Sequence, residues 1–203
     1  KFDNESLQNL KDKLKKEQGI GIIPYAYKDA YLYHQRLKEL ESNNFKVCIV
    51  RPPMIYGKGS KGNFPQLVKF ANKLRLFPYV KNQRSMLYIG NLVEFVRLMI
   101  ENNESGIFWP QNKEYSNTSE VVKMIANAKG KKEGLVKGFG WLLKFLGLFT
   151  GLVNKAFGNL CYDQNMSEYK EEYRKFSLEE SIKEISIKEL YPFPDHPFKV
   201  RDD

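Results

Sequence analysis

The chain has 203 residues, of which 33 are Lys or Arg and 24 are Asp or Glu, so its formal net charge is +9. A hydrophobic fraction of 42% over this length suits one domain with a sizeable core, or one domain with a small appendage. No run of about 20 apolar residues exists to span a bilayer, and the two isolated cysteines, Cys48 and Cys161, exclude a disulfide framework and favour buried thiols.

The lysine excess is spread along the chain and interleaved with acidic residues. Such a pattern suits either an ordinary lysine-rich surface or an anionic small ligand, and no nucleic-acid-binding motif accompanies it. We therefore expect neither a nucleic-acid partner nor a metal site. Residues 1–18 are charged and lack the apolar core of a signal peptide, so we expect a cytoplasmic protein.

The N-terminal part, residues 1–43, is predicted to be mainly helical. Residues 4–17 and 29–42 both space their apolar side chains three and four apart, which is the period of a helix. A short stretch with glycines and a proline, residues 19–24, separates the two.

The central part, residues 44–130, opens with a strand over 46–51 that ends in Pro52 and Pro53. A loop of glycines and lysines leads to Asn63, a favourable N-cap for the helix that follows. A strand that runs through a Pro/Gly loop into a helix is how an open α/β sheet presents a ligand-binding edge.

Residues 76–90 are predicted to form two short extended pieces around a polar turn at 81–84. Asn91 is then expected to cap an amphipathic helix. Its apolar positions are Leu92, Val93, Val96, Met99 and Ile100. Residues 106–109 are typical of a short buried strand, and Asn117 is placed to cap a further helix that ends near Ala128.

The C-terminal part, residues 131–203, is expected to be mainly helical. Its most apolar segment, 135–157, is interrupted by lysines and glycines, and it either covers the rest of the fold as a pair of helices or lies in a membrane interface. Ser177 and Glu180 form a capping box that predicts a last helix.

Four segments of the chain occur in the same order in a known family. They are FKVCIVRPPMIYGKGSKGNFPQLV, NQRSMLYIGNLVEFVRLMIEN, SGIFWPQNKEYSNTSEVVKMIA and FTGLVNKAFGNLCYDQNMSEYKEEYR. They resemble the C-terminal half of NAD-dependent nucleotide-sugar epimerases and dehydratases, the extended short-chain dehydrogenases/reductases, and most closely the UDP-glucose and UDP-N-acetylglucosamine 4-epimerases. The resemblance implies an incomplete Rossmann-like, NAD(P)-binding α/β fold with a mainly helical C-terminal substrate domain.

The resemblance also implies roles for the residues around the Pro/Gly loop. Pro52 and Pro53 would lie beside the nicotinamide, and Pro53 and Met54 beside the sugar. Asn63 and Phe64 open a helix whose N-terminal N–H groups would meet the uracil and ribose. From the residues alone, the prolines serve equally well to end a strand, and Asn63 is an N-cap whatever it binds.

Three further residues acquire roles in the same way. Phe77 and Tyr79 would flank the uracil, and Arg84 would grip the diphosphate, since a guanidinium fork suits phosphate oxygens. The alternatives are that Phe77 and Tyr79 belong to the core and that Arg84 is an ordinary surface residue. Tyr56 and Tyr88 are assigned to packing.

Two features of the family are missing from the sequence. There is no GxxGxxG turn for a dinucleotide, and there is no Tyr-x-x-x-Lys pair for proton transfer. The nearest catalytic candidates are Tyr25, Tyr27, Tyr31 and Lys28, none of them at the family spacing. The intact family uses NAD, but we expect this chain alone to bind no cofactor.

We therefore expect an NAD-dependent epimerase/dehydratase-like protein of polysaccharide biosynthesis, present as a fragment or degenerate form that keeps the UDP-sugar-binding half. One alternative is a non-catalytic module that binds a nucleotide sugar or pairs with another subunit. The other is a basic protein at the inner face of the membrane, attached through residues 135–157. The expected partners are a UDP-sugar or a lipid-diphosphate-linked sugar and, in addition, a second copy in a homodimer.

Overall fold

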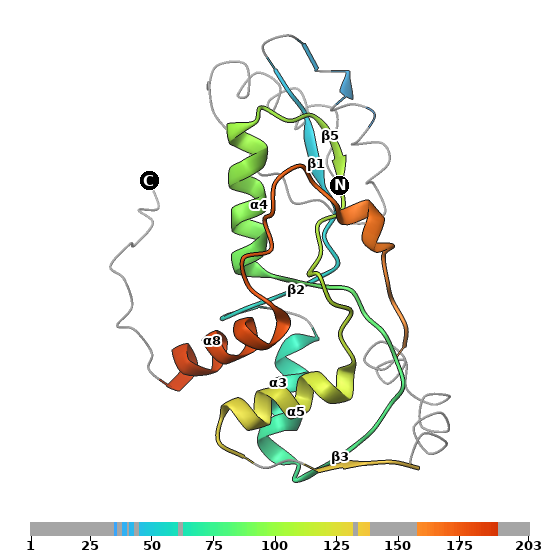
Figure 1. The fold of residues 1–203 in the computed structure, drawn as a ribbon, viewed down its shortest axis with the longest axis vertical. Coiled ribbons are helices and arrows are strands. Elements are labelled where there is room, and N and C mark those ends of the chain that lie inside the picture. Colours follow the sequence, from blue (N-terminus) through green and yellow to red (C-terminus); the bar gives the residue numbers. More distant parts are fainter. Residues whose placement is uncertain are drawn as a thin grey trace, which may run out of the picture. The chain divides into compact units, whose positions relative to one another are not determined.

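The structure is a computed structural model, shown in Figure 1. The described parts are residues 45–60, 63–131, 134–138 and 158–190, with isolated positions between 35 and 42, and side chains as far as residue 186. The chain divides into two compact units, Lys1–Phe45 and Lys46–Asp203. The first unit contributes an antiparallel bridge between Ser42 and Phe45, and all that follows concerns the second.

The described strands of the second unit form three parallel pairs. β1 (Cys48–Val50) pairs with β5 (Gly106–Phe108), β2 (Met54–Tyr56) with β4 (Met86–Tyr88), and β3 (Leu76–Pro78) with β6 (Gly134–Val136). Parallel strands cannot be joined by a tight hairpin, so each pair has a helix between its two strands in the sequence. This pairing confirms the predicted α/β class.

The described helices correspond to the periodic segments of the sequence. They are α3 (Phe64–Lys73), α4 (Ile89–Glu101), α5 (Thr118–Ala128) and α8 (Leu178–Leu190), with a 3-10 helix, η2 (Gln164–Ser167). Asn117 caps α5, since its side-chain oxygen accepts the N–H groups of Ser119 and Glu120 at 2.9 and 3.2 Å. The capping box of α8 is also confirmed, because the Ser177 N–H donates to the Glu180 carboxylate at 2.9 Å.

Two asparagines behave differently from the sequence-based prediction. The prediction that Asn91 caps a helix is wrong. Helix α4 begins at Ile89, and Asn91 lies fully buried within its first turn. Its amide donates to Asn112 and to the Phe176 carbonyl instead, so tertiary partners replace the local cap. Asn63 does stand at the N-cap of α3, but its side chain makes no capping hydrogen bond.

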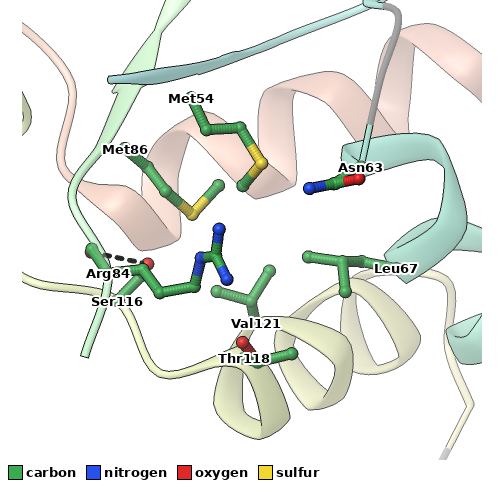
Figure 2. A pocket seen from close by; sticks show the side chains of 8 residues that line it. All are labelled: Met54, Asn63, Leu67, Arg84, Met86, Ser116, Thr118 and Val121. Atoms are coloured by element: carbon green, nitrogen blue, oxygen red, sulfur yellow. Dashed lines mark hydrogen bonds between the residues drawn. The ribbon is translucent and has the colours of Figure 1, made fainter. Parts of the chain in front are cut away.

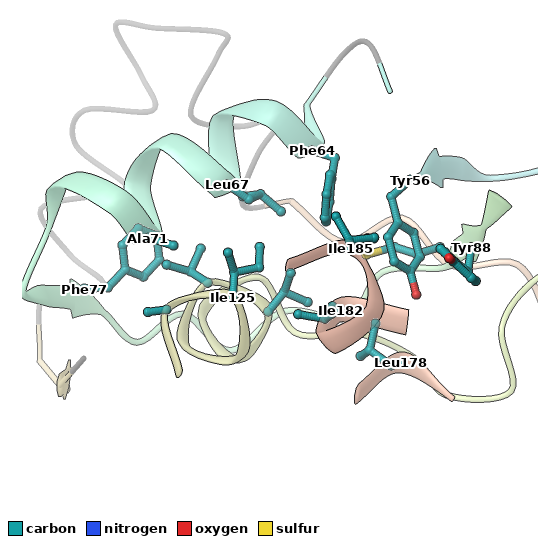
Figure 3. Close-up of a cluster of buried hydrophobic side chains, with 14 residues drawn as sticks. Tyr56, Phe64, Leu67, Ala71, Phe77, Tyr88, Ile125, Leu178, Ile182 and Ile185 are labelled. Atoms are coloured by element: carbon teal, nitrogen blue, oxygen red, sulfur yellow. The ribbon is translucent and has the colours of Figure 1, made fainter. Parts of the chain in front are cut away.

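The main core is formed by helices α3, α5 and α8 together with strands β2, β3 and β4 (Figure 3). Its largest fully buried members are Tyr56, Phe77, Met86, Ile182, Val121 and Val122. Tyr56 and Tyr88 pack with ring centroids 5.6 Å apart, which confirms their assignment to packing. Burying one large aliphatic or aromatic side chain contributes about 1.5–3 kcal/mol, so this cluster is the main source of stability.

A second cluster lies between α4 and the segment before α8. Phe95, Leu98 and Met99 of α4 are buried with Leu87, and the Phe95 ring meets Tyr173 edge to face, 4.8 Å between centroids. The apolar positions predicted for α4 are only partly right. Val93 and Ile100, which the spacing placed with Met99, are exposed.

A buried polar network ties the two clusters together around Asn112. The Asn112 side-chain oxygen accepts the Tyr88 N–H and the Asn91 amide, both at 3.1 Å. Its side-chain nitrogen donates to the Tyr56 hydroxyl at 2.9 Å, and that hydroxyl lies 2.6 Å from Ser181 Oγ. One amide therefore fixes β2, β4, α4 and α8 relative to one another.

The structure also bears on the predictions for the apolar segment 135–157 and for the two cysteines. Residues 135 and 136, assigned to the apolar segment, belong to strand β6, and residues 139–157 of that segment lie outside the described residues. The prediction of two buried thiols is wrong for Cys161, which is exposed, whereas Cys48 is half-buried in the second cluster.

Replacing Asn112 with Ala should destabilise the second unit. The Tyr88 N–H would stay buried without its acceptor, and an unsatisfied buried donor costs about 1–3 kcal/mol. We expect Asn112→Ala to lower the free energy of unfolding by about 3 kcal/mol in urea. Exposed Asn165 provides the control, and equal stability of Asn112→Ala and Asn165→Ala would contradict the role of the network.

The two thiols should differ in reactivity. Burial raises the pKa of Cys48 to about 11, with a smaller contribution from Glu104, so little thiolate forms at pH 8. We expect iodoacetamide at pH 8 to alkylate exposed Cys161 first, as followed by mass spectrometry of the native chain. Cys161→Ser should then show only the slow reaction, and fast labelling of that variant would rule out burial of Cys48.

Candidate functional site

A small pocket of about 10 Å³, which is room for about one water molecule, lies at the edge of the main core (Figure 2). It is formed by β2, the start of α3, the chain before β4 and the N-terminal part of α5. Its lining residues are Met54, Asn63, Leu67, Arg84, Met86, Ser116, Thr118 and Val121. Three of these, Met54, Asn63 and Arg84, were predicted as substrate-binding residues, and the structure brings them together.

The backbone of Arg84 is held on both of its sides. Its N–H donates to the Ser116 carbonyl and its carbonyl accepts the Ser116 N–H, both at 2.9 Å. On the other side, the Ser85 N–H donates to the Leu160 carbonyl at 2.9 Å, and the Leu160 N–H donates to the Gln83 carbonyl. Arg84 is thus fixed like a residue of a central strand, although it lies in a polar stretch between strands.

The side chain of Arg84 is buried and directed into the pocket. Figure 2 shows its guanidinium between the two methionines, Met54 and Met86, and Val121 of α5. Its Nη1 donates to the Gly158 carbonyl at 3.2 Å, and burial lowers the pKa of Arg84. A guanidinium remains charged in proteins and has five N–H donors, and low-dielectric surroundings strengthen its attraction for an oxyanion.

The chain before Arg84 is fastened to the N-terminus of α5. Asn82 donates to the Thr118 hydroxyl at 2.8 Å and accepts the Thr118 N–H at 3.0 Å. Asn117 donates to the Val80 carbonyl at 2.7 Å, and the Val80 N–H donates to Ser119 Oγ at 2.9 Å. The polar turn predicted at 81–84 is therefore a fixed segment, because side chains of α5 replace the missing strand ladder.

The remaining predicted residues do not line this pocket. Phe64 and Phe77 are buried in the main core, where Phe77 packs on Phe70 with ring centroids 5.8 Å apart. Tyr79 is half-buried beside β6, its N–H donating to the Val136 carbonyl at 2.9 Å. Pro52 and Pro53 are half-buried between β1 and β2.

Five of the lining residues were not predicted from the sequence, and for two of them the spacing of the sequence contains a usable signal. Met86 follows Arg84 at the strand period of two, and Leu67 follows Asn63 by one helical turn, so each shares a side with a predicted residue. The other three, Ser116, Thr118 and Val121, reach the site only through the pairing of residue 84 with residue 116.

The catalytic candidates Tyr25, Tyr27, Tyr31 and Lys28 lie outside the described residues. Among the residues that the structure does describe, no cluster of three His, Cys, Asp or Glu side chains could hold a metal ion. Nor does any helix in the described parts have the length and apolar character needed to cross a membrane.

Parallel strand pairs joined through helices, with a pocket at the Pro/Gly edge, define an incomplete Rossmann-type α/β protein. Residues 17–109 match the model of the NAD dependent epimerase/dehydratase family. The structure is also similar to that of UDP-glucuronic acid 4-epimerase from Bacillus cereus in complex with NAD, with a TM-score of 0.54 and 16% identity. That similarity covers 86% of this chain and 56% of the other.

Two curated relatives point to the same family. The UDP-glucose 4-epimerase of Vibrio cholerae is 28% identical over 131 residues, which are 61% of this chain and 40% of that protein. The N-acetyl-alpha-D-glucosaminyl-diphospho-ditrans,octacis-undecaprenol 4-epimerase of Escherichia coli O157:H7 is 30% identical over 90 residues, 42% of this chain and 27% of that one. The chain thus spans less than half of the length of either relative.

The family uses NAD, and the Bacillus cereus structure contains it, but the described residues do not fit a dinucleotide. The glycine nearest to a strand end in the pocket region is Gly57, whose α-carbon packs directly against the Ile89 side chain. Its lack of a β-carbon therefore serves this contact and leaves no cradle for a pyrophosphate. With no GxxGxxG in the sequence, no reaction step through NAD follows from these residues.

Removing the Asn82 side chain should loosen the segment that carries Arg84. In Asn82→Ala the Thr118 N–H and hydroxyl each lose a buried partner, which costs about 1–3 kcal/mol. We expect a lower urea midpoint and faster amide exchange of residues 80–85. Asn127→Ala, at an exposed position of the same helix, should leave both unchanged, and faster exchange in that variant would show a general effect on α5.

Proposed function

We propose that this chain carries the nucleotide-sugar-binding half of an NAD-dependent epimerase or dehydratase. In this proposal the pocket around Arg84 binds the diphosphate of a UDP-sugar or of a lipid-diphosphate-linked sugar. The observation that carries the proposal is a buried arginine, fixed through its backbone and directed into a pocket that also contains the N-cap residue of a helix, Asn63.

The chemistry of the pocket suits a phosphate group with an uncharged neighbour. The guanidinium of Arg84 can offer parallel N–H donors to two phosphate oxygens. The start of α3 adds the partial positive charge of a helix N-terminus. The side chain of Asn63, at the N-cap, forms no capping hydrogen bond with this helix. Met54, Met86, Leu67 and Val121 supply apolar walls that exclude water and strengthen these interactions.

The printed names of the two relatives support the substrate class. One acts on UDP-glucose and the other on a sugar linked through diphosphate to undecaprenol, so a sugar diphosphate is common to both. The expected proton-transfer pair is missing from the sequence, and the dinucleotide turn is missing as well. We therefore propose binding without turnover for the chain alone.

Calorimetric titration of the natural chain and of the Arg84→Ala variant, each with UDP and with UMP, tests this assignment. UDP should bind the chain more tightly than UMP, because only UDP places a second phosphate at the guanidinium. Removing one charged hydrogen-bonding group costs about 1.5–3 kcal/mol of binding free energy, so Arg84→Ala should lower the affinity for UDP by about 10- to 100-fold. The preference for UDP over UMP should vanish in the same variant.

Exposed Arg75 offers a control that removes the same charge elsewhere. Arg75→Ala should bind UDP like the natural chain, and Arg84→Lys should recover only part of the affinity, since an ammonium lacks the fork. Equal losses of UDP affinity in Arg75→Ala and Arg84→Ala would show that the net charge of the chain, and not a specific site at Arg84, determines binding. No heat with UDP at millimolar concentration would refute the proposal.

A further inference from the structure

Acidic residues are unevenly distributed along the chain. Positive and negative residues alternate over most of it, but between Glu41 and Glu94 the sequence has nine Lys or Arg residues and no Asp or Glu. Residues 121–162 have seven lysines and a single acidic residue, Glu133, which lies outside the described residues. These two stretches meet where β3 of the first pairs with β6 of the second. The fold thus gathers positive charge at this place, at the bottom of Figure 1.

Four exposed basic residues lie at the ends of the β3–β6 pair, and we call them the basic border. They are Lys73, Arg75, Lys131 and Lys137. Lys73 is the last residue of α3, and Lys131 Nζ donates to the Asn72 carbonyl at 2.7 Å. Both lysines therefore lie at the C-terminal end of α3, where the helix dipole favours a cation.

Much of this positive charge has no carboxylate beside it. Elsewhere in the unit, surface lysines lie next to acidic residues, and Lys183 Nζ, for example, is 2.7 Å from a carboxylate oxygen of Glu179. Lys73, Arg75 and Lys137 form no such pair with the residues that the structure describes. Their charges are thus free to meet an anionic partner.

The β3–β6 pair has one side toward the core and one side away from it. Phe77 and Leu135 are partners in the register, and both pack in the main core. Because side chains alternate along a strand, Leu76 and Val136 belong to the outer side. Leu76 is 64% exposed, and Leu74, two residues before it in extended backbone, is 41% exposed. The outer side is therefore an uncovered aliphatic surface between the basic residues.

The side chain of Leu76 is supported from below although it is exposed. A β-carbon added to Gly134, its partner on β6, would lie 2.9 Å from Leu76 Cδ2. Leu76 thus lies across the backbone of β6, where Gly134 leaves room for it. An apolar side chain that packing already holds loses less conformational entropy when a partner covers it.

We propose that the basic border and the outer side of β3–β6 bind the surface of an anionic lipid bilayer. The two leucines would enter the boundary between headgroups and acyl chains, while lysine and arginine pair with lipid phosphates. Their long apolar stems allow the charged ends to stay among the headgroups. The inference goes beyond the proposed function, because the pocket around Arg84 lies at the start of α3 and this surface lies at its end.

Other partners fit this surface less well. A second copy of the chain, in a two-fold symmetric contact, would bring two basic borders together, and like charges oppose such an interface. A nucleic acid would attract the basic border, but its phosphate backbone offers no apolar phase to the two leucines. An anionic bilayer offers both the negative surface and the apolar phase.

The test is co-sedimentation of the full chain with vesicles of phosphatidylglycerol and phosphatidylcholine, compared with vesicles of phosphatidylcholine alone. We expect binding to the anionic vesicles, weakened at high salt. The double variant Lys73→Gln, Arg75→Gln should lower the vesicle affinity about 25-fold, since each charge near the surface contributes about 5-fold. Leu76→Ser should lower it about 10-fold.

Matched controls change the same kinds of residue elsewhere. Lys175→Gln with Lys183→Gln removes two charges that have carboxylate partners, and Val93→Ser removes an aliphatic side chain that is 62% exposed on α4. Both controls should bind the anionic vesicles nearly as the natural chain does. Equal losses in a control and in the matching test variant would make the binding non-specific and overturn the inference.

The remaining outcomes are equally decisive. No sedimentation with anionic vesicles, or equal sedimentation with phosphatidylcholine alone, overturns the inference, and so does tighter binding to single-stranded RNA at the same salt. A clearly lower urea midpoint of Leu76→Ser would show that the chain itself covers Leu76. UDP affinity should be unchanged in all these variants, because none of the altered residues lines the pocket, so failure of this inference leaves the proposed function intact.

Discussion

The fold of the second unit depends on the satisfaction of one buried amide. Asn112 is only 1% exposed, and its side-chain oxygen and nitrogen bind the backbone of β4, the hydroxyl of Tyr56 and the amide of Asn91. Each partner belongs to a different element, so none can shift without leaving a polar group unsatisfied inside the protein. Hydrophobic burial drives these elements together, and this network selects one arrangement of them.

The pocket is a second consequence of the same arrangement. The segment around Arg84 has few strand partners of its own, yet it is fixed by Ser116, Leu160 and the side chains that begin α5. A long flexible cation would lose conformational entropy on binding an anion, and this cost falls when packing already holds the side chain. An arginine held in this way is therefore better suited to recognise a phosphate group than a flexible lysine on the surface.

Local sequence patterns predicted what depends on local interactions. The caps at Asn117 and Ser177 and the strands on either side of residues 81–84 follow from spacing and capping chemistry, whereas the α/β class was implied by the family resemblance. Asn91 looked like a cap because its true partner lies 21 residues further on. On α4 the apolar positions form one wide arc, and the spacing alone could not tell which part of it faces the core. Ser116 and Thr118 joined the site through non-local pairing, which leaves no local pattern to read.

The sequence distance across the Asn112 network has a consequence for the order of folding. Tyr56 meets Ser181 across 125 residues, and Tyr88 meets Glu184 across 96. Long-range contacts of this kind require loop closure before they stabilise anything, and they slow folding. On the ribosome, the main core would remain open until α8 has left the exit tunnel. During that interval the apolar faces of α3 and α5 are exposed to chaperones and to other nascent chains.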